Sequence, residues 1–342
     1  MKKNFDWVGW VSEHRVPLLT TVLAALLAVP FLGLSNYVVR VFCMVFIYGM
    51  LTLSLNIVTG YLGATSMGHA ALYCVGAYVG ALFSTRLGLS FWWCLLLGIV
   101  FGAAFGTFLG VCTMRLSGSY MTVTTLAFAQ VITMVTKNWE SLTNGTLGVK
   151  GIPKPELFGL ILTLKNGGLY YLALALLVLC VAFVALIMQS KFGRAFIAIR
   201  DDELSAKMMG LNTRGYRVLG CTLSGALASV AGCYYAAMIG YIDPVTFSFD
   251  ISMTILTMVI LGGLASIPGS LIGAGILVVF PELLRSLITY RFFFFGFILV
   301  IMMRLRPQGI LGGVKSREYR LPKGVVSVKR GTRSAGEGKE GA

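Results

Sequence analysis

Acidic residues are scarce in this 342-residue chain, which has 13 Asp and Glu against 28 Lys and Arg. The long apolar segments before Ser190 contain neither Asp nor Glu. A carrier driven by a proton or sodium gradient usually places carboxylates at membrane depth, so the sequence disfavours that class. The chain also lacks the GxxxxGK[ST] loop that holds nucleotide phosphates, so the energy for transport must come from elsewhere.

Residues that build metal and catalytic sites are equally few. The chain has only 2 His, and His69 is the one that lies within an apolar segment. Its 7 Cys lie in or beside apolar runs without the spacing of metal ligands, so we expect them to behave as small apolar side chains. A membrane enzyme would need a nucleophile with a base, or a metal cluster. We therefore expect no enzymatic activity and no metal or cofactor bound by this chain.

Apolar residues dominate instead. They make up 57% of the chain, charged residues only 12%, and the mean hydropathy is +0.84. This composition predicts a polytopic, all-α transmembrane bundle. We expect about ten membrane helices, including short or broken ones, and 251–289 reads either as two crossings or as one crossing with a re-entrant segment. The candidate spans are 16–34, 37–58, 64–83, 91–111, 117–135, 168–188, 218–241, two within 251–289, and 292–303.

The net charge of +15 raises the question of nucleic acid, but the basic residues do not alternate with aromatic residues on one soluble face. Most of them cluster before the first span, in 190–217 and after the last span. The positive-inside rule places these segments, and with them both termini, in the cytoplasm. We divide the chain into a cytoplasmic segment 1–15, a transmembrane domain 16–313 and a basic, disordered tail 314–342.

The segment 190–217 is too rich in charge to lie in lipid, yet its apolar residues are ordered. Their spacing predicts two short amphipathic helices. Asp201 or Asp202 can cap the second helix, and Glu203 and Lys207 are placed to pair at i, i+4. The segment is either an interfacial helix pair on lipid headgroups or a docking surface for a soluble partner. The apolar sets are Phe192, Phe196 and Ile199, followed by Leu204, Met208 and Leu211.

Small residues recur along two spans. Gly98, Gly102, Gly106 and Gly110 form a smooth stripe that lets another helix approach closely, and the small residues of 218–241 are the expected partner.

Polar residues within other spans mark a candidate translocation route. His69 is either a structural imidazole bonded between helices or part of this route. Two further features support a translocation route, and these are a Gly-rich interruption near residue 262 and the hydroxyls in 117–135. The candidate lining residues are Ser66, His69, Thr122, Thr125, Gln130, Gly262 and Gly263.

Several ordered blocks resemble the branched-chain amino acid permease family of ATP-binding-cassette importers. One of them also resembles the coupling loop of importer permeases in general, with Leu204 where a Glu usually stands. The blocks are GYLGATSMGHAALYCVGAY (60–78), TNGTLGVKGIP (143–153), FGRAFIAIRDDELSAKMMGLN (192–212), VILGGLASIPGSLIGA (259–274) and RPQGILG (306–312).

The resemblance implies a multi-pass subunit of a bacterial inner membrane importer for branched-chain amino acids. Its implied partners are a homologous permease in a heterodimer, two cytoplasmic ATPases and a periplasmic or tethered solute-binding protein that meets the 137–165 loop. Alternatives are another small solute, such as urea, a short amide or another amino acid, or less favourably a secondary carrier. The implied ATPase-coupling residues are Arg194, Arg200, Asp202, Glu203, Ala206 and Gly210.

Overall fold

The computed structural model describes residues 35–283 except 117, 158 and 165, together with residues 26, 27, 30, 296, 304 and 309–311. Helices account for most of this part of the chain, and the strands are two-residue pairs. The longer helices are α3 (Asn36–Asn56), α4 (His69–Arg86), α5 (Phe91–Thr113), α6 (Ser119–Asn138), α8 (Gly168–Gln189), α9 (Lys191–Asp201), α11 (Thr213–Ile239), α12 (Phe249–Gly262) and α13 (Ile267–Leu283). The short elements are η2 (Ile57–Tyr61), α7 (Glu140–Thr143), η3 (Gly145–Leu147), α10 (Glu203–Met208), η4 (Pro244–Phe247), β1 (Val149–Lys150), β2 (Glu156–Leu157), β3 (Leu160–Ile161) and β4 (Tyr241–Ile242).

Five of the described helices are long and apolar enough to cross a membrane. The predicted all-α membrane bundle is thereby confirmed. The spans 16–34 and 292–303 lie outside the described residues except at 26, 27, 30 and 296, as do the segments 1–15 and 314–342. The five helices are α3 continued through η2, α5, α6, α8 and α11.

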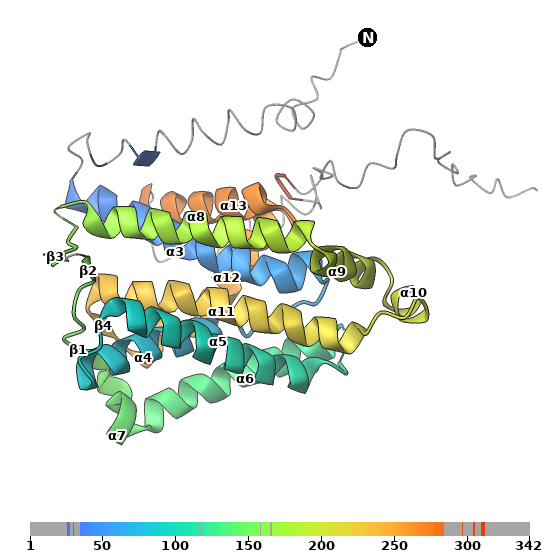
Figure 1. The fold of residues 1–342 in the computed structure, drawn as a ribbon, viewed down its shortest axis with the longest axis horizontal. Coiled ribbons are helices and arrows are strands. Elements are labelled where there is room, and N and C mark those ends of the chain that lie inside the picture. Colours follow the sequence, from blue (N-terminus) through green and yellow to red (C-terminus); the bar gives the residue numbers. More distant parts are fainter. Residues whose placement is uncertain are drawn as a thin grey trace, which may run out of the picture.

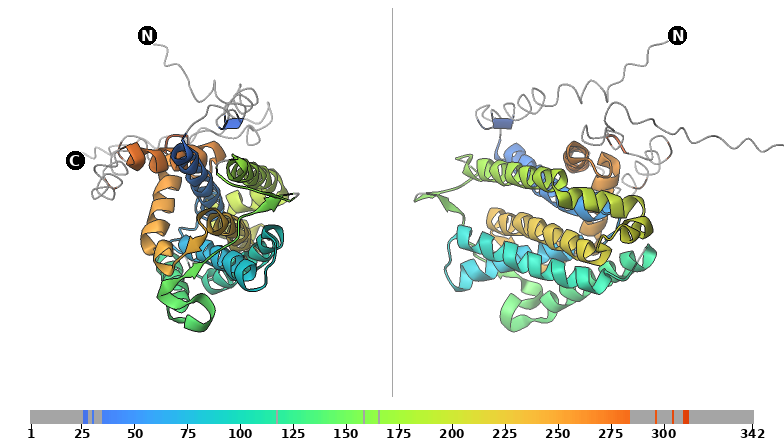
Figure 2. Two further views of the ribbon diagram at one scale, coloured as in Figure 1. Left: turned by 90° about the vertical axis from the view of Figure 1, so that its left-hand side faces the viewer. Right: turned by 45° about the vertical axis from the view of Figure 1, so that its right-hand side comes forward.

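The long helices run side by side along the bundle, with α9 and α10 at one end and the short strands at the other (Figures 1 and 2). We call these the loop end and the strand end. At the strand end β1 pairs with β4 and β2 with β3, both antiparallel. The loop between α6 and α8 is therefore folded, and β1 fastens it to the segment that follows α11.

The most extensive helix contact joins α5 to α11. The four glycines of the α5 stripe lie against α11, where Gly102 faces Gly225 and Ser229. A Cβ on Gly102 would come within 2.5 Å of the Gly225 carbonyl oxygen, so the two backbones meet at a distance that only glycine allows. This seam places α11 at the centre of the bundle, between α5, α4 and α3.

Helices α12 and α13 form an antiparallel hairpin, because Gly262 lies against Gly269 and Gly273 lies against Met258. The bend between them spans residues 263–266. Helix α13 then runs back along α3 toward the strand end, with Thr52 bonded to the Ser270 carbonyl. The described part of 251–289 is thus a helical hairpin.

Candidate functional site

The loop end is built from α9 and α10, which fold as separate short helices. Ser190 caps α9 by accepting a hydrogen bond from the Phe192 amide. Of the apolar set expected on α9, Phe196 and Ile199 are buried and pack onto the bundle, whereas Phe192 is 49% exposed.

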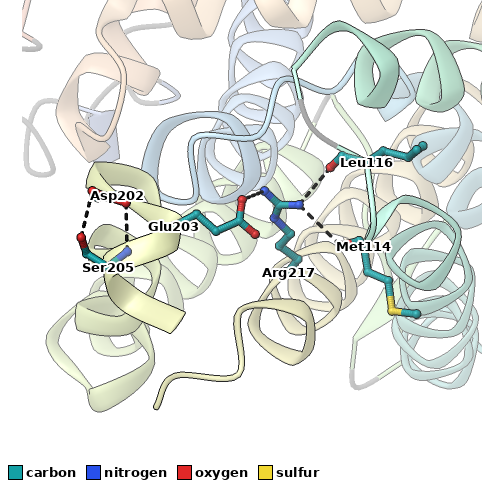
Figure 3. A network of polar contacts seen from close by, with 6 residues as sticks. All are labelled: Met114, Leu116, Asp202, Glu203, Ser205 and Arg217. Carbon is teal, nitrogen blue, oxygen red and sulfur yellow. Dashed lines mark hydrogen bonds and ion pairs between the residues drawn. The ribbon is translucent and has the colours of Figure 1, made fainter. Parts of the chain in front are cut away.

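Asp202 caps α10 and separates it from α9. Its Oδ1 accepts from the Ser205 amide at 3.0 Å and its Oδ2 from the Ser205 hydroxyl at 2.9 Å (Figure 3). These bonds favour the carboxylate and lower the pKa of Asp202 below its ordinary value. A depressed pKa means that the cap is intact at neutral pH and is lost only as the pH falls through that lowered value.

Arg217, in the first turns of α11, fastens α10 to the bundle (Figure 3). Its Nη2 lies 2.6 Å from the Glu203 Oε2, and its Nη1 donates to the Leu116 carbonyl at 2.9 Å. The guanidinium therefore joins α10, α11 and the turn after α5. The expected pairing of Glu203 with Lys207 is wrong, because α11 folds back so that Arg217 reaches the carboxylate first.

The outward face of α10 is strongly apolar. Leu204, Met208 and Met209 are 65%, 78% and 85% exposed, whereas Ala206 on the opposite face is buried. Gly210 ends the helix at φ +84°, a conformation that favours glycine. Of the apolar set expected on this segment, Leu204 and Met208 are therefore displayed, whereas Leu211 is partly buried against the core.

Two arginines of α9 differ in their hydrogen-bond partners. Within the described residues the Arg194 side chain donates to the Gln189 carbonyl, just before its own helix, at 3.4 Å. Arg200 instead donates through Nη1 to the Gly60 carbonyl in η2, at 2.9 Å. The Arg200 stem also lies against Gly63, where an added Cβ would meet Cγ at 2.8 Å. Arg200 thus connects α9 with the end of the α3 crossing.

The first break in the helical crossings is the non-helical segment 62–68 before α4. The Thr125 hydroxyl of α6 accepts from the Met67 amide at 3.0 Å, and Thr122 donates to the Thr65 carbonyl at 3.4 Å. Ser66 is buried beside them. Of the candidate lining residues, these hydroxyls do gather at one place.

His69 begins α4 and is buried. Its Nε2 lies 2.5 Å from the Ser54 hydroxyl, which itself donates to the Leu51 carbonyl. Because Ser54 has a single proton, Nε2 is the donor to Ser54 in this arrangement. This matches the interpretation of His69 as an imidazole bonded between helices. Gln130 lies exposed further along α6, away from the group at 62–68.

The second break is the α12–α13 bend, which contains Gly263 and follows Gly262. It is held by Asn56, a buried amide near the end of α3. Asn56 was not among the residues singled out from the sequence. An unexplained amide inside the apolar run 37–58 is the signal that could have found it, since buried polar groups in membrane segments need partners.

Comparison with known proteins identifies the family. The model for the "Branched-chain amino acid transport system / permease component" family matches residues 12–303. The chain is 35% identical over 315 residues to the high-affinity branched-chain amino acid transport system permease protein LivM of Escherichia coli (strain K12), covering 86% of this chain and 74% of LivM. It is 26% identical to the permease protein LivH of Salmonella typhimurium (strain LT2), covering 78% of this chain and 91% of LivH. No solved structure matches. The chain therefore belongs to the family of permease components of branched-chain amino acid transport systems.

Proposed function

We propose that this chain is one of two permease subunits of an ATP-binding-cassette importer in the bacterial inner membrane. In this proposal the loop end and both termini lie in the cytoplasm, and the α9–α10 pair docks with an ATPase subunit. The observation that carries the proposal is the exposed apolar face of α10, a helix otherwise firmly fastened to the bundle.

The shape of the loop end favours a protein partner over lipid headgroups. Helix α10 projects beyond the ends of the long helices (Figure 1), whereas an interfacial helix lies in the plane of the membrane. Leu204, Met208 and Met209 are exposed apolar side chains within one short segment, and apolar side chains gathered on a water-exposed surface mark protein contacts. The Arg217 contacts make the pair a rigid attachment that can pass force to α11.

Two kinds of relative support a second permease as partner. LivM and LivH are both named as permease proteins of a high-affinity branched-chain amino acid transport system. We therefore expect this chain to pair with a second, homologous permease. The folded loop at the strand end would receive a periplasmic or tethered binding protein, and ATP would be hydrolysed in the ATPase subunits.

We assign the coupling surface to Arg194, Asp202, Glu203 and Gly210, together with the exposed face of α10. Of the other residues expected there, Ala206 is buried and would fix α10 to the bundle, and Arg200 is bonded to η2 and would connect the α9–α10 pair with the bundle. The translocation route would pass the two breaks, near Ser66 and Thr125 at the first and Gly262 and Gly263 at the second. Substrates would be branched-chain amino acids, with other small solutes of similar size as the alternative.

Co-purification with the ATPase subunits tests this assignment. Met208→Glu with Met209→Glu places two charges on the exposed face without touching the buried Ala206 face. We expect the double variant to insert in the membrane, lose the ATPases on purification and lose ATP-dependent leucine uptake. Val245→Glu, at an apolar position on η4 that is 65% exposed, should keep the ATPases. Unchanged ATPase recovery with the α10 variant would refute the docking surface.

A further inference from the structure

A continuous set of contacts runs from α9 to the α12–α13 bend through the end of the α3 crossing. Its first contact is the bond from Arg200 to the Gly60 carbonyl. Gly60 lies in η2, a π-helical turn that extends α3 and whose residues are all buried. Turns of this kind inside helices are frequent at functional sites. Arg200 therefore bonds to an irregular turn rather than to an ordinary helix end.

Asn56 carries the contact onward from η2 to the bend. Its Oδ1 accepts from the Ala265 amide at 2.9 Å. Its Nδ2 donates to the Ser270 hydroxyl at 2.8 Å and to the Ser266 carbonyl at 3.2 Å. The side chain is 1% exposed, so a lost bond could not be replaced by water. One amide thus binds the bend and the first turn of α13 at three points.

Gly60 lies between the Arg200 bond and the Asn56 bonds. A Cβ there would collide with the Asn56 Oδ1 and come within 2.5 Å of the Ala265 amide nitrogen. Gly60, which is bonded to Arg200, therefore packs directly against both Asn56 and its partner Ala265. If Arg200 displaced η2, Asn56 and Ala265 would have to move as well.

The bend that Asn56 holds is conformationally strained. Ala265 has φ +57° although it carries a Cβ, and Gly263 has φ +120°. A left-handed conformation is unfavourable for a residue with a Cβ, such as Ala265, and persists only where its surroundings fix it, whereas glycine adopts a positive φ readily. The segment 309–311 also bonds to this place, with the Ile310 amide donating to the Leu261 carbonyl at 3.0 Å. The bend is thus a strained element held by contacts from outside the hairpin.

We propose that Arg200 and Asn56 are positioning residues that link the α9–α10 pair to the α12–α13 bend, so that movement of the docked pair changes the bend. This inference rests on the proposed docking of an ATPase at the loop end. Arg200 would transmit the displacement to η2, and Asn56 would release or re-form its bonds to the bend. Neither residue needs to touch the solute or the ATPase.

The test uses the complete importer in proteoliposomes, with permease pair, ATPases and leucine-loaded binding protein. The variants are Arg200→Gln and Asn56→Leu, which remove the two ends of the link. We expect each to keep the ATPases bound and hydrolysing ATP near the wild-type rate. The leucine imported per ATP hydrolysed should fall about tenfold in each, the size of a modest coupling energy.

A double variant separates a link from two independent defects. If Arg200 acts through Asn56, Arg200→Gln combined with Asn56→Leu should be no worse than either alone. Multiplied losses in the double variant would overturn the proposal. Arg115→Gln is the matched control, since Arg115 is an exposed arginine on the turn after α5 at the same end, and it should leave the ratio unchanged.

Ser270→Ala is a milder variant that keeps the test valid if Asn56→Leu misfolds. It removes the hydroxyl partner of the Asn56 amide and leaves Asn56 itself in place. It should assemble normally and give a smaller loss, about threefold, in leucine imported per ATP. A wild-type ratio in Ser270→Ala and Arg200→Gln would overturn the link. Failure of the docking proposal itself looks different, because the variant Met208→Glu with Met209→Glu would then keep the ATPases. Loss of the ATPases in Arg200→Gln alone would make Arg200 a docking residue and also overturn the link.

Discussion

At the scale of single residues, glycines allow the helices of this protein to pack closely. The four-residue recurrence along 98–110 predicts a smooth helix face, and the structure shows α11 resting on that face. What spacing could not reveal is how close the approach is. At Gly102 the α11 backbone itself occupies the place of a side chain. The cost of a larger residue there is therefore set by backbone atoms that cannot turn aside.

Gly102→Val should destabilise the protein strongly, because the new side chain would push α5 away from Gly225 and Ser229. Overpacking of this kind costs about 1–3 kcal/mol. The thermal unfolding temperature of the purified protein should fall, and yield should fall with it. Gly275→Ala on α13 is the control, since nothing lies within 4 Å of its added Cβ. A Gly102 variant as stable as the control would contradict the close contact.

Polar partners were harder to predict than glycines, for a physical reason. The pairing of Glu203 with Lys207 follows from local helix geometry, but Arg217 wins because it approaches from another helix and is more deeply buried. Asn56 likewise binds Ala265 and Ser266, which are far away in the sequence. Local spacing gives helix faces and caps, such as the Asp202 cap, and it does not give the tertiary partners of single polar groups.

At the scale of elements, the interrupted segments are where the sequence was most informative. Gly262 and Gly263 predict a break, and the structure places a tight hairpin bend there. The positive φ of Ala265 could not be predicted, since alanine gives no signal for that conformation. The folded α9–α10 pair follows from its spacing, whereas the outward direction of Leu204 and Met208 does not.

The bend offers a pair of opposite substitutions. Gly263→Ala introduces a Cβ at φ +120°, which should destabilise the protein by about 1–3 kcal/mol. Ala265→Gly removes a Cβ at φ +57°, and relief of left-handed strain should offset the greater chain entropy of glycine. Thermal unfolding should therefore show a clear loss for Gly263→Ala and little or none for Ala265→Gly. The reverse order would contradict the backbone of the bend.

At the scale of the whole molecule, the helical membrane class follows from composition, and the arrangement of helices does not. Apolar runs locate the described spans closely, but nothing in them indicates that α11 lies at the centre with α5, α4 and α3 around it. The sidedness comes from charge alone. Lys and Arg concentrate in the α9–α10 segment, so the positive-inside rule predicts a cytoplasmic loop end.

Cysteine labelling tests this sidedness directly. Of the seven cysteines only Cys112 is exposed, so Cys112→Ser removes the accessible native thiol. In that background, Met209→Cys marks the loop end and Leu147→Cys the strand end, at positions 85% and 72% exposed. A membrane-impermeant maleimide should label Leu147→Cys in intact spheroplasts and Met209→Cys only in inverted vesicles. The proposed docking requires α10 to lie on the side that holds ATP, so labelling of Met209→Cys from outside would overturn both the ATPase docking surface and the link through Arg200.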